Sequence, residues 1–242
     1  MSARPAGTAP AAAAEFRRGL VAALPFALSF VPAALVLGDE AARKGFSPVE
    51  VPLLTGLNFA GGSEFAAIGL WTSPPHILLI VAVTFLVNSR HILMGATFAR
   101  YLGRLPRRAV PLVLFLMCDE AWALGLTDAE RRAEAGRGPL LSLPYYLGGA
   151  LFLYVSWVVS TTAGALVGPV LGDVRAVGLD MAFPALFIVL LRGLWRGPRA
   201  AAPWVASLIA AGTTYLLVPG GWYVPVGAAC GLLAAGVTAE RA

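Results

Sequence analysis

Charged side chains are scarce in this sequence, and their scarcity decides the class of protein. Only 13% of the 242 residues are charged, whereas soluble domains carry about 25%. The remaining residues form long hydrophobic runs, and the mean hydropathy is +0.77. These runs do not alternate between apolar and polar residues, as the strands of a transmembrane β-barrel do. The sequence therefore predicts an all-α protein that crosses a membrane several times.

Cysteine is also rare, and no group of cysteine, histidine or acidic residues has the spacing of a metal site. Cys118 and Cys230 lie in apolar segments far apart in the sequence, so we expect both to pack as small hydrophobic side chains. The net charge of +5 comes from basic residues in short loops beside apolar segments. Positive charge there orients a membrane protein, so we expect neither a nucleic-acid partner nor a cofactor.

The hydrophobic runs form about eight segments. They lie near residues 19–38, 51–71, 77–101, 109–127, 143–167, 178–195, 203–218 and 222–238. Residues 1–15 are rich in Ala and Pro and are expected to be a disordered tail; they lack the basic start and short apolar core of a cleaved signal peptide. The charged stretch 128–138, DAERRAEAGRG, is expected to be a solvated linker between two membrane repeats, 16–127 and 139–242.

Three basic clusters suggest how the chain is threaded. They are Arg17/Arg18, Arg100/Arg104/Arg107/Arg108 and Arg192/Arg196/Arg199. If all eight segments cross the membrane and the N-terminus is cytoplasmic, the second and third clusters face outside, against the positive-inside rule. If the second and sixth segments are broken or re-entrant, all three clusters are cytoplasmic and three full spans lie on each side of the linker. The two halves then have opposite orientations, as in the inverted repeats of many secondary transporters. The alternative is a simple eight-span bundle with a weak charge bias.

The second and sixth segments also resemble each other in sequence. NFAGGSEFAAI aligns without gaps with DMAFPALFIVL. Asn58 begins the first and Asp180 the second, and each segment is interrupted midway, by Gly61-Gly62 or by Pro184. The other interpretation of Asp180 is a helix N-cap.

The second segment contains a dense polar cluster, AGGSEF at 60–65. Glycine lets a ligand approach the main chain, and an unwound stretch frees N–H and C=O groups that can hold the carboxylate and ammonium of an amino acid. The candidate substrate-binding residues are Asn58, Gly61, Gly62, Ser63 and Glu64, together with Asn88. The alternative is a Gly-Gly packing contact with Glu64 near an interface.

A second polar cluster, NSRH at 88–91, ends the third apolar run. On a continuous helix Asn88 and His91 share a face, while Arg90 points elsewhere. An unpaired guanidinium at this depth is costly, so Arg90 is the expected counter-ion of a membrane carboxylate. The alternative is a snorkelling arginine at a helix end, with His91 merely hydrogen-bonded.

Asp119 and Glu120 are adjacent carboxylates inside the apolar run PLVLFLMCDEAWALGL. Each costs roughly 2.5 to 3.5 kcal/mol at bilayer depth, so the chain must pair them, protonate them or use them. They differ by about 100° around a helix, so one is expected to line a pathway and the other to be paired. Apolar surroundings favour the neutral form, which suits a proton carrier. The candidate proton-coupling and ion-pair residues are therefore Asp119, Glu120, Arg90, His91 and Asp180.

Together these motifs resemble the AzlC family, the large subunit of branched-chain amino acid exporters. The resemblance covers nearly the whole chain and rests on four short motifs in order: AGGSEF, NSRHILMG, CDEAW and DMAFPALF. It implies proton-coupled export of leucine, isoleucine, valine and similar amino acids across the bacterial plasma membrane, with a small AzlD-type membrane subunit as partner. This chain departs from the family pattern at Glu64, where the family usually has Gln, which puts the coupling and the substrate in doubt.

Two other functions are compatible with the sequence. An intramembrane hydrolase could use Ser63 and His91 as a dyad, although GSEF does not resemble the small-residue turn expected around such a serine. A channel or a scaffold subunit without transport is the other alternative, and a channel would conduct without stoichiometric proton movement.

Overall fold

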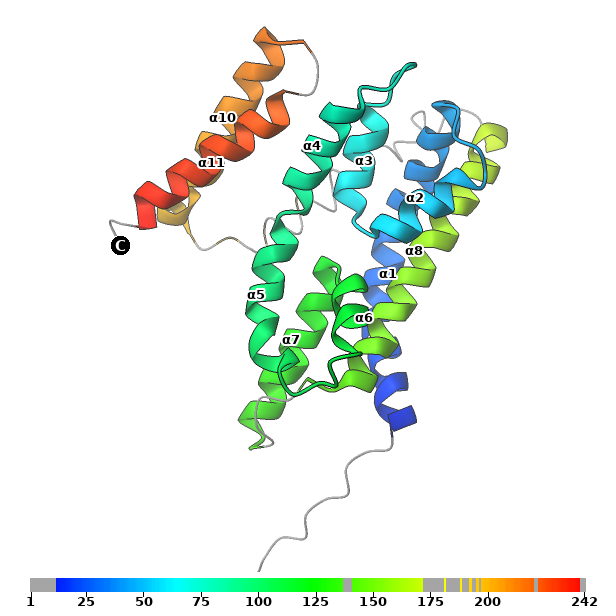
Figure 1. Cartoon of the computed structure of the whole chain (residues 1–242), viewed down its shortest axis with the longest axis vertical. Helices are drawn as coiled ribbons and strands as arrows, with labels where there is room; N and C mark the ends of the chain where they lie inside the picture. Colours follow the sequence, from blue (N-terminus) through cyan, green and yellow to red (C-terminus); the bar gives the residue numbers. More distant parts are fainter. Residues whose placement is uncertain are drawn as a thin grey trace, which may run out of the picture. The chain divides into compact units, whose positions relative to one another are not determined.

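The computed structural model describes residues 12–136, 141–171, 197–219 and 222–239, with the single positions 181, 188, 192 and 195 between them. Throughout these residues the regular elements are helices (Figure 1). Three are long and apolar enough to cross a membrane: Ala12–Arg43, Ile77–Leu102 and Leu143–Gly168. Two shorter apolar helices, Ala202–Leu217 and Tyr223–Thr238, follow them. The prediction of an all-α polytopic membrane protein is confirmed.

The described helices follow one another in chain order. In order they are α1 (Ala12–Arg43), α2 (Glu50–Asn58), α3 (Gly61–Gly69), α4 (Ile77–Asn88), α5 (Arg90–Leu102), α6 (Val110–Phe115), α7 (Asp119–Glu134), α8 (Leu143–Leu171), η3 (Pro198–Ala201), α10 (Ala202–Leu217) and α11 (Tyr223–Ala239). The tail predicted at 1–15 ends earlier than expected, because residues 12–15 already belong to α1. Residues 1–11 lie outside the described residues.

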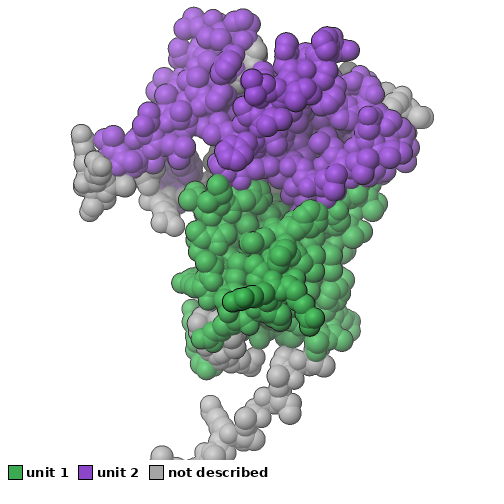
Figure 2. Space-filling model, in the orientation of Figure 1, with its two compact units in different colours: residues 1–31, 91–159 green, residues 32–90, 160–242 purple. Residues whose placement is uncertain are grey.

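Packing divides the chain into two compact units (Figure 2). Unit 1 takes its described residues from 1–31 and 91–159, and unit 2 from 32–90 and 160–242. Both units therefore contain part of α1 and part of α8. This division by packing differs from the division by sequence into 16–127 and 139–242, which stays a prediction about internal repetition.

In unit 1, α1 and α8 pack closely and run in the same direction. A Cβ on Gly19 would collide with the main-chain carbonyl of Tyr145, so only glycine allows this approach. Further along, the rings of Phe30 and Trp157 meet edge to face with centroids 5.4 Å apart. Inverted halves would require their first helices to run in opposite directions. In this respect the structure differs from the expected inverted repeat: α1 and α8 begin at the same end of unit 1.

In unit 2, α2 and α3 form a helical hairpin: the residues just before α2 lie beside the residues just after α3. The ring of Phe46, just before α2, lies 4.6 Å from the ring of Trp71, just after α3. The Nζ of Lys44 also donates to the Trp71 carbonyl at 3.1 Å. A segment crossing about 30 Å of hydrocarbon could not bring these residues together. The second segment is therefore broken, as predicted, and its re-entrance in a membrane stays a prediction. Almost all of the sixth segment lies outside the described residues.

The fourth segment, expected to cross the membrane, is instead a second hairpin made of α6 and α7. Tyr146 contacts both halves: its Oη donates to the Val113 carbonyl at 2.9 Å, and a Cβ on Gly125 would meet its ring. The α7 residue Glu130 lies 3.8 Å from Arg100 near the end of α5, so the hairpin returns to the end where it began.

The stretch expected to be a solvated linker, 128–138, also differs. Its first part continues α7 to Glu134, and Asp128 is buried against α1. Asp128 receives hydrogen bonds from Arg18 and from Arg132, so its charge is used for packing and is not solvated.

Candidate functional site

The α2–α3 hairpin breaks at Phe59 and Ala60, and the break has an unusual backbone. Phe59 is left-handed, with φ 45° and ψ 48°, which is uncommon for a bulky side chain. Ala60 follows with φ −146° and ψ 68°, and α3 begins at Gly61. Such a conformation costs on the order of 1–3 kcal/mol and persists only where the surroundings enforce it.

Side chains of the predicted binding residues enforce this break. The backbone N–H of Ala60 donates to Glu64 Oε1 at 2.9 Å, and the Ser63 hydroxyl donates to the Ala60 carbonyl at 2.9 Å. The Nδ2 of Asn58 donates to Ser63 Oγ at 2.8 Å. The Nδ2 of Asn88, on α4, donates to Asn58 Oδ1 at 3.0 Å. The structure therefore brings together four of the residues predicted from sequence, Asn58, Ser63, Glu64 and Asn88.

This network is buried. Ser63 and Glu64 are both 0% exposed, so Glu64 is stabilised by hydrogen bonds and not by water. Thr55 and Thr161, which sequence analysis missed, form another buried polar contact: their hydroxyls lie 3.1 Å apart and both residues are fully buried. The Thr55 hydroxyl also donates to the Val51 carbonyl of its own helix at 3.0 Å, so the sequence alone gives no sign of its second partner on α8.

The ends of the two half-helices determine what this break can bind. The N–H groups of Gly61 and Gly62 at the start of α3 make no hydrogen bond within the described part of the chain. A helix N-terminus attracts anions, and the C-terminal end of α2 carries the opposite partial charge. The break thus offers donors for a carboxylate and a negative dipole end for an ammonium group.

The Ser63 hydroxyl takes part in two hydrogen bonds. Its hydroxyl proton is donated to the Ala60 carbonyl, and the same oxygen accepts from Asn58. Ser63 belongs to unit 2 and His91 to unit 1, so the dyad stays untested.

The second break, in unit 1, separates α6 from α7 at residues 116–118. The Leu116 N–H donates to the Leu112 carbonyl at 3.1 Å, and the Met117 N–H donates to Leu114 at 3.2 Å, which tightens and ends α6. Cys118 is extended, with φ −105° and ψ 175°. Asp119 and Glu120 then form the first turn of α7, where the helix dipole favours negative charge.

The third polar cluster lies where α4 meets α5. Asn88 ends α4, the Ser89 hydroxyl donates to the Leu86 carbonyl at 2.7 Å, and Arg90 begins α5. Arg90 belongs to unit 2, whereas Asp119 and Glu120 belong to unit 1, so the expected ion pair stays a prediction.

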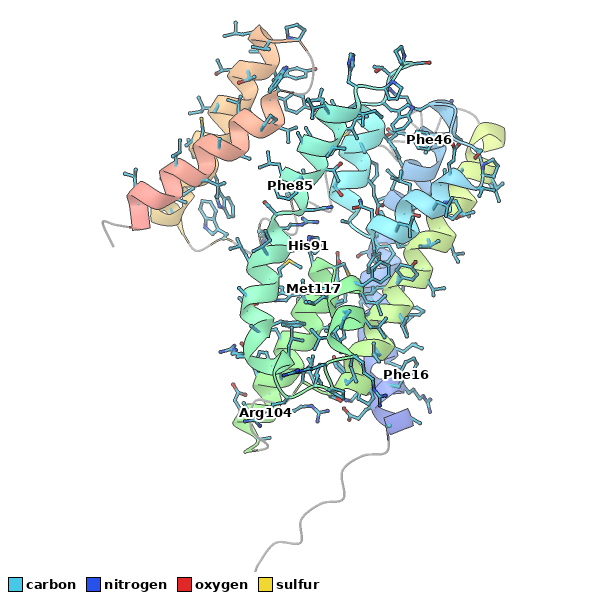
Figure 3. The ribbon with its side chains drawn as sticks, viewed as in Figure 1. Phe16, Phe46, Phe85, His91, Arg104 and Met117 are labelled. Atoms are coloured by element: carbon cyan, nitrogen blue, oxygen red, sulfur yellow. The ribbon has the colours of Figure 1, made fainter. Side chains whose placement is uncertain are left out.

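Within unit 1, His91 and the second break lie toward the same end. Figure 3 shows His91 and Met117 at the opposite end of unit 1 from Phe16 and Arg104. Asp119 and Glu120 follow Met117 in the chain, separated from it by Cys118. Asp180 lies outside the described residues.

An ion-pair network at the other end of unit 1 was not predicted. The guanidinium of Arg18 donates to Asp128 at 2.6 Å and to Glu15 at 2.8 Å, and it stacks 3.9 Å above the Tyr145 ring. Arg132 bonds Asp128 at 2.7 Å and also Glu15. The network borders an open hollow of about 340 Å³. Only the pairs three or four residues apart on one helix could be predicted from the spacing of charges in the sequence.

Comparison with known proteins identifies the family. The family model described as AzlC protein matches residues 25–171, more than half of the chain. The chain belongs to the AzlC family. No solved structure matches it.

Relatives within the AzlC family come from bacteria and an archaeon. An uncharacterized membrane protein of Archaeoglobus fulgidus is 33% identical over 74% of this chain and 75% of its own length. The inner membrane protein YgaZ of Escherichia coli is 28% identical over 92% of this chain and 90% of its own. The branched-chain amino acid transport protein AzlC of Bacillus subtilis is 26% identical over 85% and 81%, respectively.

Proposed function

We propose that this AzlC-family protein is a secondary transporter that exports branched-chain and similar apolar amino acids across a bacterial plasma membrane. We propose further that export is coupled to protons and that a small AzlD-like membrane subunit takes part. The observation that carries the proposal is the broken α2–α3 hairpin, whose buried polar groups surround an interrupted backbone. Family membership supports the substrate class, because one relative is named as a branched-chain amino acid transport protein.

In this proposal the zwitterionic substrate binds at the α2–α3 break. Its carboxylate accepts hydrogen bonds from the N–H groups of Gly61 and Gly62, and its ammonium lies toward the C-terminal end of α2. Asn58, Ser63, Glu64 and Asn88 hold the break open. Burial of Ser63 and Glu64 excludes water, which strengthens these interactions.

Proton coupling is assigned to the carboxylates. A zwitterion carries no net charge, so a proton gradient can drive its export only if a protein group gains and loses a proton during the cycle. Asp119 and Glu120 suit this role because they are carboxylates in the first turn of α7, beside the break between α6 and α7. One of them, or Asp180, would exchange protons, with Arg90 or His91 as its charge partner.

Transport by purified protein in liposomes tests the proposal. We expect labelled leucine to move against its gradient when a proton gradient is imposed, and more slowly or not at all without the co-reconstituted small subunit. Empty liposomes are the control. Leucine flux that dissipates its own gradient but never opposes it would favour the channel alternative, and labelling of Ser63 by a fluorophosphonate would favour the hydrolase.

Coupling is tested by comparing two kinds of flux in Asp119→Asn and Glu120→Gln. Neutralising the coupling carboxylate should leave exchange of labelled for unlabelled leucine intact and abolish uphill export, since exchange requires no net proton movement. Both variants concentrating leucine as well as the wild type would refute the assignment.

A further inference from the structure

The break between α6 and α7 removes the helical hydrogen bond that the Val113 carbonyl would accept in a continuous helix. In an α-helix the Val113 carbonyl would accept the N–H of Met117, four residues later. In this structure the Met117 N–H donates to Leu114 instead, at 3.2 Å. A buried carbonyl that loses its partner costs free energy comparable to a lost hydrogen bond.

Tyr146, near the start of α8, supplies the missing donor. Its Oη donates to the Val113 carbonyl at 2.9 Å, and this bond is buried. Val113 is 0% exposed and Tyr146 is 2% exposed, so water cannot replace the hydroxyl.

The ring of Tyr146 also packs against α5 and α7. It meets the Phe98 ring of α5 edge to face, with centroids 5.8 Å apart. A Cβ on Gly125 of α7 would lie 2.9 Å from the Tyr146 ring, so α7 can pack against it only because it has glycine at this position. One side chain of α8 therefore contacts α5, α6 and α7.

From this arrangement we propose that Tyr146 is a positioning residue for the α6–α7 break and, through it, for Asp119 and Glu120. The hydroxyl stabilises the interrupted form of the segment. Without it, the Val113 carbonyl regains a partner only if the Met117 N–H turns back to it, which extends α6 and moves Cys118 and the carboxylates that follow. The effect on transport rests on the proposed function; the effect on the break does not.

Tyr146→Phe removes only the hydroxyl and keeps the ring contacts. Tyr101→Phe is the matched control, because Tyr101 is also buried and its ring touches Phe98, with centroids 6.4 Å apart. The Tyr101 hydroxyl makes no hydrogen bond within the described part of the chain. Size-exclusion chromatography in detergent checks that both variants fold.

Cys118 reports on the break directly. In a Cys230→Ala background it is the remaining cysteine of the chain. We expect Tyr146→Phe to change its rate of reaction with a small membrane-permeant maleimide by about fivefold or more, the factor that corresponds to about 1 kcal/mol. Tyr101→Phe should react at the wild-type rate. An unchanged rate in folded Tyr146→Phe would overturn the proposal.

Transport measurements distinguish the role of Tyr146 in the break from the role of Asp119 and Glu120 in proton coupling. In Tyr146→Phe we expect leucine exchange to persist while gradient-driven export falls and its pH profile shifts, which a general loss of stability would not produce. An altered Cys118 rate with unchanged gradient-driven export would show that Tyr146 positions the break but that Asp119 and Glu120 do not couple transport to protons. That result would overturn the coupling part of the proposed function.

Discussion

At the scale of single residues, Glu64 combines two roles that can be separated. Its Oε1 accepts the Ala60 N–H within a fully buried turn, a structural role that any side-chain carbonyl at the same place could fill. Its capacity to carry a charge is a different property. A glutamine would keep the acceptor and remove the charge.

We therefore predict that Glu64→Gln folds normally and that Glu64→Ala does not. The amide Oε1 still accepts from Ala60, whereas alanine leaves a buried N–H without a partner, at a cost of about 1–3 kcal/mol. Thermal unfolding in detergent measures the difference. Leucine exchange should persist in Glu64→Gln, and complete loss of exchange in this folded variant would show that the charge itself binds substrate.

Arg90 provides a second test at this scale. If it neutralises a membrane carboxylate, Arg90→Ala should lose expression or transport, because removing one partner of a buried pair costs about 3–5 kcal/mol. Combination with Asp119→Asn or with Glu120→Gln should restore expression for the true partner. Wild-type expression and transport by Arg90→Ala alone would indicate a snorkelling side chain.

At the scale of elements, the two hairpins differ in how visible they are in the sequence. The α2–α3 break contains Gly61-Gly62 and a run of polar residues, so its interruption could be predicted. The α6–α7 break lies in LFLMC, which contains neither glycine nor proline. It depends on Tyr146 in a distant helix, and no local pattern encodes that contact.

The end of α7 was mispredicted for a related reason. Asp128 and Arg132 looked solvated because their partners, Arg18 and Glu15, are more than a hundred residues away. The other charged residues of this stretch are exposed, as expected: Glu130, Arg131 and Glu134. Hydrophobic periodicity reveals which segments are membrane-embedded, but it does not reveal where a charged turn packs.

The ion-pair network should stabilise the base of the α6–α7 hairpin. Arg132→Gln leaves Glu15 and Asp128 each with one partner fewer, and we expect a loss of about 1–3 kcal/mol, because the site is partly reached by solvent. Arg131→Gln is the matched control: Arg131 lines the same hollow and forms no ion pair among the described residues. The melting temperature should fall by several degrees in Arg132→Gln and stay near wild type in Arg131→Gln. Equal melting temperatures would contradict this role.

At the scale of the whole molecule, one end of unit 1 carries an excess of arginine. The beginning of α1 and the loop after α5 both lie there, as the positions of Phe16 and Arg104 show (Figure 3). Arg18 and Arg132 join them through the ion-pair network, and Arg100 lies 3.8 Å from Glu130. Positive residues favour the cytoplasmic side, so we expect this end to face the cytoplasm.

The hairpin formed by α6 and α7 and a fourth segment that crosses the membrane predict different sides of the membrane for Gly136. Ile77–Leu102 is long enough to cross the membrane, so Thr72 before it and Arg104 after it should lie on opposite sides. Because α6 and α7 form a hairpin, Gly136 should lie on the same side as Arg104, whereas a fourth segment that crosses would place it with Thr72.

Single cysteines at these three positions, in a Cys118→Ala/Cys230→Ala background that still transports leucine, can be labelled in intact cells with a membrane-impermeant maleimide. We expect Thr72→Cys to react from outside, and Arg104→Cys and Gly136→Cys to react only after the membrane is permeabilised. Labelling of Gly136→Cys in intact cells would show that the fourth segment crosses the membrane and that the hairpin does not exist there.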